Sequence, residues 1–521
     1  MENIDVVREN ISFEQLFNEG NGETVLKGEY LIPDTHPDVY KVLAVDCKPY
    51  ITNKEILKDK LLVEGEIQYN VMYLAKEDET LGAHSVTYND KFSNYIDIAG
   101  LEHNMVCEAE CDVEHIYATI INERKISLDG ICDIIYEVYK TDTLDLVKDI
   151  ESQKNVEMKK KIETFDNMVA SKEIDLQGTE NITIGTEKPE IDTILKCVGM
   201  IHKKDVKAAD GKITCSCFVK FSIVYRAKGT RDLYTVDEDI FMNTDEDFEN
   251  TYPDISVLDS FELDKADCDL DSDDLGEQRI INLSAAVKAK IKIYDKTTIE
   301  ILDDAYMTDK VIGIKKDDVS LAALLGDGKS ESIVKDNLYL KEEDSVPVEI
   351  INTKGKAEIV DKKIEDGKIK AEGFVKIEVI YRTDSEDYLN MITGEVPFNA
   401  NIDINNVKLN TKIVVKSFLE SIQAAIEANT IAVKATVTTT AKAWGEENKN
   451  CVTDVEELDE EVPKKKASIT IYTVQLNDTL WDLAKKYNTT VENIAKINEI
   501  EDESYIEAGK KLIIPGRALI S

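Results

Sequence analysis

The stretch KIKAEGFVKIEVIYRTD, at residues 368–384, alternates apolar and polar side chains and runs up to a tyrosine. Two other stretches share this pattern: KLLVEGEIQYNVMYLAK at 60–76 and KITCSCFVKFSIVYRAK at 212–228. Because successive side chains of a strand point to opposite faces of a sheet, the alternation predicts strands with one buried face. The fold is therefore predicted to be mainly β and to contain a repeated unit.

Small residues keep the same register in the three copies. Gly65 and Gly373 precede the tyrosines Tyr73 and Tyr381 at the same spacing, and Cys217 takes this position in the middle copy. A small residue inside a strand predicts a β-bulge or the close approach of a neighbouring backbone. Each copy also closes with a long alternating stretch, of which KISLDGICDIIYEVY at 125–139 is the first.

One unit therefore occurs three times, at residues 1–145, 169–308 and 309–444, and each copy is expected to form a sandwich-like β domain. The three domains are expected to follow one another like a string. The segment 146–168 is polar with spaced apolar residues and is expected to be a helix or a connector. The segment 445–467 is acidic and then basic, has little to bury, and is expected to be a flexible linker.

The last segment, at 468–516, has a different pattern that predicts strand, helix, helix and strand. Thr479 and Asp482 have the spacing of a capping box at the start of the first helix, and Thr489 and Glu492 repeat it for the second. The faces expected to be buried are Leu480, Leu483, Ala484 and Tyr487 on the first helix, and Val491, Ile494, Ala495 and Ile497 on the second.

This segment resembles the LysM family throughout its length. The similarity rests on an aromatic-Thr-Val start at 472–474, on DTLWDLA at 478–484, on Asn498, and on GKKL at 509–512 before Pro515. LysM modules generally bind N-acetylglucosamine-containing glycans in a shallow groove between two loops. The resemblance implies a partner- or glycan-binding groove at Asn477, Asp478, Thr479, Leu480, Trp481, Ile500, Glu501 and Asp502.

Two departures weaken the sugar interpretation of this groove. Asn477 replaces the usual glycine, and the second loop, EIEDESYIE at 499–507, is strongly acidic. Trp481 has two interpretations, stacking on a sugar ring or anchoring a protein contact, and we favour the protein contact because aromatic residues are common anchors of interfaces.

The three copies resemble the SPOCS domain, the spore coat associated domain of endospore-forming bacteria. The similarity rests on GFVKIEVIYR at 373–382, on PFNANIDI at 397–404 and on the long closing strand; the Cys215–Cys217 stretch of the middle copy departs from it. The resemblance implies a non-enzymatic scaffold of Clostridia, made in the mother-cell cytoplasm and recruited to the forespore surface. Its implied partners are a coat ATPase of the SpoIVA type and further copies of itself; the alternative is a protein of the spore envelope that binds peptidoglycan glycan.

Bulk composition excludes some partners. The net charge of −41 would repel nucleic acid and anionic lipid, so neither nucleic-acid binding nor direct membrane insertion is expected. No signal peptide or membrane span is visible, and the nine cysteines include no CxxC pair, so reduced thiols are expected. Cys215 and Cys217 are expected to be small buried residues, and Cys451 to be the most exposed thiol.

No residue pattern indicates catalysis or a metal. His103, Cys107, Cys111 and His115 are evenly spaced, but their ends would lie about 40 Å apart on a strand or about 18 Å apart on a helix. One tetrahedral site cannot gather them. The acidic stretch at 267–277 lacks the glycine and the spacing of a calcium loop. No catalytic residue, metal or cofactor is therefore predicted.

Overall fold

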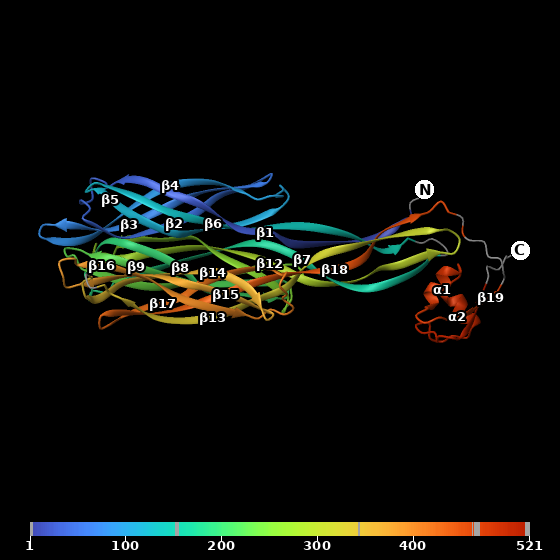
Figure 1. Ribbon diagram of the computed structural model, residues 1–521. Coiled ribbons are helices and arrows are strands. Elements are labelled where there is room, and N and C mark those ends of the chain that lie inside the picture. Colours follow the sequence, from blue (N-terminus) through green and yellow to red (C-terminus); the bar gives the residue numbers. More distant parts are fainter. Residues whose placement is uncertain (1–3, 152–155, 342–343, 461, 463–468, 516–521) are drawn as a thin grey trace.

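The computed structural model of the protein describes residues 4–151, 156–341, 344–460, 462 and 469–515. Strands run side by side along one elongated body, which narrows at one end into a stalk (Figure 1). A small helical domain near the C-terminus lies beside the end of the stalk (Figure 1). The fold is mainly β, as the alternating sequence pattern predicts.

The first repeat consists of two three-stranded antiparallel sheets around one hydrophobic core. One sheet has the order β2-β3-β4 and the other β1-β6-β5, so the last strand of the repeat lies between its first and fifth strands. This arrangement confirms the predicted sandwich. The strands are β1 (Val6–Leu31), β2 (Lys41–Leu57), β3 (Lys60–Glu77), β4 (Thr80–Asp97), β5 (Val106–Asn122) and β6 (Lys125–Ile150).

The second and third repeats have the same topology, each with its own core. The second repeat contains β7 (Val156–Thr183), β8 (Ile191–Ala209), β9 (Lys212–Ala227), β10 (Leu233–Asp247), β11 (Ser256–Ser272) and β12 (Gln278–Met307). The third repeat contains β13 (Ile312–Tyr339), β14 (Pro347–Glu365), β15 (Lys368–Thr383), β16 (Leu389–Ile402), β17 (Lys412–Glu427) and β18 (Thr430–Glu457).

The three alternating stretches form β3, β9 and β15, each the central strand of its sheet. Their tyrosines, Tyr73, Tyr225 and Tyr381, are among the largest fully buried side chains in the described residues. Cys215 and Cys217 point from β9 into the core of the second repeat and are buried, as expected. The alternation therefore marks the strands around which each sandwich core forms.

The small residue of the repeated pattern faces a β-bulge, as predicted. The register of β2 against β3 shifts opposite Gly65, where a Cβ atom would lie 2.4 Å from the carbonyl oxygen of Tyr50. A Cβ atom at Gly373 would lie 2.1 Å from the carbonyl oxygen of Glu358. No side chain fits at either position because the opposing backbone occupies the space.

Six long strands continue past the sandwiches and form the stalk (Figure 1). They pair as three antiparallel ribbons, β1 with β6, β7 with β12 and β13 with β18. The alternative of a helix at 146–168 is wrong, because the described residues of this segment belong to the ends of β6 and β7. The expected flexible linker at 445–467 is wrong as far as Glu457, where β18 ends, and its residues 461 and 463–467 lie outside the described residues.

The stalk has a hydrophobic core that the three ribbons share. It includes Phe13, Phe165 and Leu321, at corresponding positions of β1, β7 and β13, and Leu146, Ile301 and Cys451, at corresponding positions of β6, β12 and β18. Because three ribbons share this core, each ribbon needs an apolar residue only at intervals, and such a sparse pattern resembles a linker in sequence. Cys451 is 0% exposed, which corrects the expectation of an exposed thiol, and burial raises its pKa.

The three sandwiches pack against one another, which corrects the expected string of domains. One cluster of buried apolar residues joins the sheets β2-β3-β4, β10-β9-β8 and β14-β15-β16 of the three repeats. It includes corresponding residues of the three repeats, Leu43, Leu195 and Ile351. A string of separate domains would have left these side chains in water.

Buried charges also join the repeats. Asp46 of the first repeat forms ion pairs with Lys196 of the second at 3.0 Å and with Lys354 of the third at 2.8 Å. The side chains of Asp46 and Lys196 are 7% and 2% exposed. Burial alone would raise the pKa of Asp46, but the two ammonium groups outweigh it and lower that pKa.

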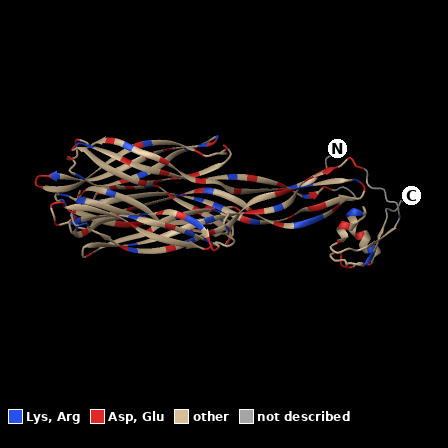
Figure 2. Ribbon diagram, in the orientation of Figure 1, with Lys and Arg blue, Asp and Glu red and all other residues tan. Residues whose placement is uncertain are grey.

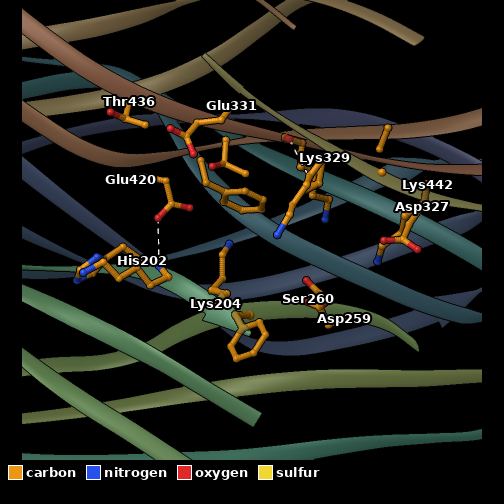
Figure 3. A pocket seen from close by; sticks show the side chains of 18 of the residues that line it. His202, Lys204, Asp259, Ser260, Asp327, Lys329, Glu331, Glu420, Thr436 and Lys442 are labelled. Carbon is orange, nitrogen blue, oxygen red and sulfur yellow. Dashed lines mark hydrogen bonds between the residues drawn. The ribbon is translucent and has the colours of Figure 1, made fainter. Parts of the chain in front are cut away.

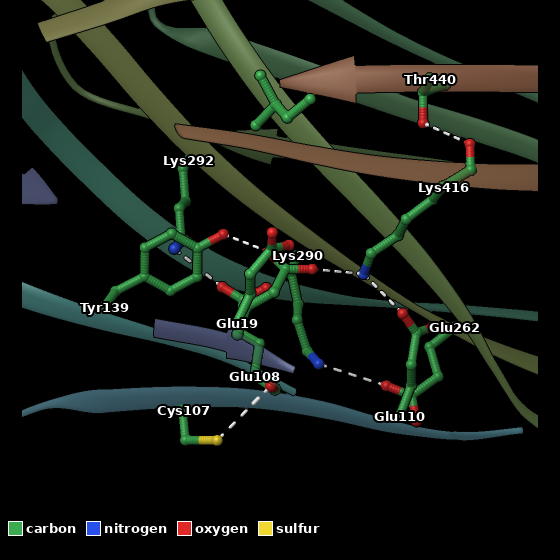
Figure 4. Close-up of polar contacts among 12 residues, drawn as sticks. Glu19, Cys107, Glu108, Glu110, Tyr139, Glu262, Lys290, Lys292, Lys416 and Thr440 are labelled. Carbon is green, nitrogen blue, oxygen red and sulfur yellow. Dashed lines mark hydrogen bonds and ion pairs between the residues drawn. The ribbon is translucent and has the colours of Figure 1, made fainter. Parts of the chain in front are cut away.

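A second set of ion pairs between repeats surrounds Lys292 and Lys416 (Figure 4). Lys292 of the second repeat contacts Glu108 at 2.9 Å and Glu14 at 3.0 Å, both in the first repeat. Lys416 of the third repeat contacts Glu110 at 2.6 Å and Glu137 at 2.7 Å, again in the first repeat. The first repeat thus supplies the carboxylates and the other two supply the lysines, so the three repeats are not interchangeable.

The second repeat also contains a disulfide, which corrects the expectation that all cysteines are reduced. Cys197 on β8 and Cys268 on β11 are joined, with Cα atoms 6.5 Å apart. The bond links the two sheets of one sandwich at their edge. The acidic stretch at 267–277, which contains Cys268, begins in strand β11.

Candidate functional site

The C-terminal domain consists of the predicted strand, helix, helix and strand: β19 (Ile469–Thr473), α1 (Leu480–Lys486), α2 (Val491–Ile497) and β20 (Lys511–Pro515). Thr479 caps α1, because its side chain accepts a hydrogen bond from the backbone N–H of Asp482. The cap of α2 is Thr490, which accepts from the N–H of Asn493. The expected pair of Thr489 and Glu492 is therefore one residue out of register.

The core of this domain follows the predicted helix faces with one exception. Leu480, Leu483 and Ala484 of α1 are buried, as are Ile494 and Ala495 of α2. Tyr487 and Val491 pack against this cluster and are partly buried. Ile497 is 46% exposed, because it lies in the last turn of α2, beyond the part of the helix that α1 and the sheet cover.

The first loop of the predicted groove connects β19 to α1. Asn477 adopts a left-handed φ of 72°, a conformation that asparagine tolerates, and its side chain is exposed. The Asp478 carboxylate accepts a hydrogen bond at 2.7 Å from the backbone N–H of Gln475, which holds the loop closed. Leu480 is only 2% exposed and so belongs to the domain core, not to the surface of the groove.

The second loop follows α2. The Asn498 side chain holds its base, because its amide donates to the carbonyl of Ile513 at 2.7 Å and its oxygen accepts from the N–H of the same residue at 2.7 Å. Ile500 packs against the domain core, while Glu501 and Asp502 are exposed. The loop therefore presents carboxylates to an incoming ligand.

Trp481, the remaining predicted site residue, contacts the end of the stalk. Its indole N–H donates to the Asp304 carboxylate of β12 at 2.9 Å. The Lys485 ammonium, one turn further along α1, lies 2.7 Å from both oxygens of the same carboxylate. Burial alone would raise the pKa of Asp304, but the hydrogen bonds from Lys485 and Trp481 outweigh it and lower that pKa.

Tyr306 completes this contact. Its hydroxyl donates to the carbonyl oxygen of Thr489 at 2.8 Å, and its ring lies edge-on to Trp481 with centroids 5.0 Å apart. Tyr306 is 5% exposed and belongs to the same apolar cluster as the core of the C-terminal domain. Sequence reasoning missed Asp304 and Tyr306, because nothing in their local pattern indicates that a distant domain contacts them.

A cavity of about 520 Å³ lies between the second and third repeats (Figure 3). Lys204 points into it with its ammonium 3.1 Å from the centre of the Phe418 ring, and burial lowers its pKa to about 8. The charged side chains around the cavity are Lys203, Lys204, Lys329, Lys416, Lys442, Asp259, Asp327, Glu331 and Glu420. Charges of both signs line it, so electrostatics favour neither an anion nor a cation.

Elsewhere, acidic and basic residues are interspersed along the strands of the body and the stalk (Figure 2). No group of three or more His, Cys, Asp or Glu side chains in the described part of the chain is arranged to hold a metal ion. None of the helices among these residues is long and apolar enough to span a membrane.

Comparison with known protein families accounts for most of this architecture. The SPOCS-domain model of the SipL family matches residues 38–121, 190–271 and 348–427, and the LysM domain model matches residues 472–515. No curated protein and no solved structure matches the chain. Each SPOCS match spans four strands, β2–β5 in the first repeat, whereas the long strands that build the stalk lie outside the matches.

The chain is therefore a repeat protein of three SPOCS domains and one C-terminal LysM domain. In this composition of domains it is similar to the SipL-type SPOCS proteins. Both domain families are non-catalytic, and their combination fits a spore coat protein that carries a glycan-binding type of module.

Proposed function

We propose that this protein is a non-enzymatic scaffold of the spore coat. In this proposal its LysM domain docks a coat morphogenetic ATPase of the SpoIVA type, and its three SPOCS repeats mediate assembly around the forespore. The protein would be made in the mother-cell cytoplasm and recruited to the forespore surface. Self-association of the rigid SPOCS body would extend the assembly.

The contact made by Trp481 is the observation that carries the protein-docking part of this proposal. In a sugar-binding groove an aromatic ring beside the first loop would be available for stacking, but here Trp481 contacts a carboxylate and a tyrosine ring of protein. Aromatic side chains with one polar atom are typical anchors of protein interfaces. The face of the LysM domain that bears Trp481 therefore already makes a contact with another part of the protein.

The acidic second loop supports the same proposal. Glu501 and Asp502 are exposed at the edge of the groove, and a neutral glycan offers no positive charge to balance them. A protein partner with lysine or arginine side chains would provide this balance. Binding of N-acetylglucosamine-containing glycan is the alternative, because Asn477 adopts a left-handed φ of 72°, which the usual glycine would also adopt without strain, and its side chain is exposed.

Capture of partners by the full-length chain from sporulating cells tests this function, with and without a chitooligosaccharide competitor. Replacing the exposed carboxylates by lysine, in Glu501→Lys/Asp502→Lys, is expected to reduce capture of the coat ATPase at least tenfold. Asn477→Ala and Ile500→Asp probe the same groove, with circular dichroism to show that the domain still folds. Glu79→Lys changes an exposed charge in the turn between β3 and β4, outside the LysM domain, and serves as the control.

Capture of the ATPase that is insensitive to the sugar and lost in the double lysine variant would support the docking function. Capture that disappears with the sugar would instead support the glycan alternative. Undiminished capture by all groove variants would contradict the placement of the interface.

A further inference from the structure

The three ribbons of the stalk end in corresponding sequences, LVKDIE at 146–151, ILDDAY at 301–306 and CVTDVE at 451–456. Asp149, Asp304 and Asp454 occupy the same place in the pairing of β6, β12 and β18 with their partner strands. The residue two positions further is an exposed glutamate, Glu151 or Glu456, in the first and third ribbons. In the second ribbon it is Tyr306, which is buried.

The partners of the three aspartates differ accordingly. Asp149 pairs with Lys160 of the neighbouring ribbon at 2.7 Å, and Asp454 pairs with Arg8 at 2.9 Å. The corresponding cation for the second ribbon, Lys316, contacts Asp303 at 3.4 Å. The Asp304 carboxylate of the second ribbon instead contacts Trp481 and Lys485 of the LysM domain.

The three aspartates also differ in burial. The side chain of Asp304 is 19% exposed, compared with 37% for Asp149 and 56% for Asp454. The carboxylate binds an indole N–H and an ammonium group, and the tyrosine two residues along fills the apolar gap beside Trp481. The carboxylate and the tyrosine therefore act together as one recognition element.

We propose that the LysM face formed by Trp481, Lys485 and the carbonyl of Thr489 is a recognition site for an extended Asp-X-Tyr segment of protein, and that Asp304 and Tyr306 of this chain occupy it in the free protein. A partner would bind by presenting a segment of the same chemistry and displacing the stalk. This inference deepens the docking function proposed above and depends on it for its biological role.

One interaction opposes the docking of the LysM domain on the stalk and would favour its displacement by a partner. Glu157, the strand partner of Tyr306, lies under the LysM domain, and burial together with the carboxylates of Glu492 and Glu503 raises its pKa. Like charges that face each other across a contact oppose it. A partner segment without this glutamate would keep the Asp and Tyr contacts and avoid the repulsion.

The structural part can be tested on the full-length chain labelled with 5-fluorotryptophan. The chain has two tryptophans, so ¹⁹F NMR gives two resonances, and Trp481→Phe assigns them. Asp304→Asn combined with Tyr306→Glu is expected to move the Trp481 resonance and to increase its broadening by a soluble gadolinium chelate severalfold. Asp149→Asn, the corresponding change in the first ribbon, is expected to leave it unchanged. An unmoved, equally protected resonance in the double variant would overturn the docked state.

A peptide with the sequence ILDDAYM, residues 301–307, tests the recognition chemistry. In the Asp304→Asn/Tyr306→Glu chain, called the opened chain because its LysM domain is expected to leave the stalk, the peptide is expected to shift the Trp481 resonance back towards its position in the unaltered protein. A peptide with asparagine for both aspartates and alanine for the tyrosine is expected to have no effect. Failure of the native peptide to act at a concentration on the order of 1 mM would overturn recognition of Asp-X-Tyr.

Partner capture separates this inference from the proposed function. If the opened chain captures at least threefold more coat ATPase than the unaltered protein, the stalk and the partner compete for one face. If the Trp481 resonance behaves as expected but neither chain captures the ATPase, the docked state stands and the proposed function fails. Equal capture by both chains would overturn the competition.

Discussion

Glu137 of the first repeat and Lys416 of the third repeat form an ion pair of 2.7 Å between strands β6 and β17. Glu137 is 4% exposed, and the hydroxyl of Tyr139 donates a second hydrogen bond to it. Burial alone would raise the pKa of Glu137, but Lys416 outweighs it and lowers that pKa. The pair therefore joins two repeats through a carboxylate that is almost completely buried.

Replacing Lys416 by methionine is expected to lower the free energy of unfolding by about 3 kcal/mol, because the change leaves a buried carboxylate without its cation. Denaturant unfolding followed by circular dichroism measures the effect. Lys370→Met removes the exposed pair with Glu365 and should change little. A loss from Lys416→Met no larger than that control would contradict the role of the buried pair.

The same pair predicts a loss of stability in acid. Because the folded pKa of Glu137 lies below its ordinary value of 4.5, its contribution is fully present above about pH 4.5 and is lost as the pH falls through the folded pKa. Glu137→Gln is expected to lower the melting temperature at pH 7 and to flatten its decline between pH 5 and about pH 3. Parallel pH profiles for the variant and the original protein would show that Glu137 is not responsible.

The bulge glycines should tolerate no side chain. Gly373→Ala is expected to destabilise the third repeat by about 1–3 kcal/mol, because the new Cβ atom would lie 2.1 Å from the carbonyl oxygen of Glu358. Gly313→Ala is a matched control, since its Cβ atom would lie 3.3 Å from a flexible leucine side chain. Equal melting temperatures for the two alanine variants would rule out the backbone clash as the reason for the glycine.

The stalk is expected to be a folded part of the protein that resists proteases. Leu146→Ala removes a fully buried side chain from its core and should cost about 2–5 kcal/mol, with faster tryptic cleavage in the stalk. Thr143→Ala changes an exposed residue of the same strand and should leave the cleavage rate unaltered. Rapid cleavage of the unaltered protein at 146–150 would instead indicate an unfolded connector in this part of the chain.

The Cys451 thiol should be inert while the protein is folded. Burial excludes reagents and raises its pKa, so a disulfide reagent at pH 8 is expected to modify the same number of thiols in the original protein and in Cys451→Ser. In denaturant the variant should lose one reactive thiol. One fewer modified thiol in the folded variant would place Cys451 at the surface.

Local patterns predicted those features that depend on neighbouring residues alone. Alternation located β3, β9 and β15, the repeated small residue located the bulges at Gly65 and Gly373, and capping chemistry located the start of α1 at Thr479. The second helix shows the limit of such signals, because Thr489 and Thr490 are adjacent and both have a polar residue at capping distance. Only the helix geometry decides between them.

Among the candidate site residues, Asn477, Glu501 and Asp502 lie exposed in the two loops that the LysM pattern indicates, and Leu480 lies in the core. The roles of these residues in binding stay a prediction. Trp481 was recognisable as an anchor, but its contact with Asp304 was not, because the two residues are far apart in the chain. No periodicity connects them.

By itself the sequence determined the class of fold, the threefold repetition and the LysM module, because side-chain alternation and short motifs act over a few residues. Tertiary structure alone decided how the three repeats pack, why a polar segment with few apolar residues becomes a stalk, and where Trp481 lies. Each of these outcomes depends on surfaces that three distant segments bury together. A core shared by Leu146, Ile301 and Cys451 exists only once all three ribbons have met.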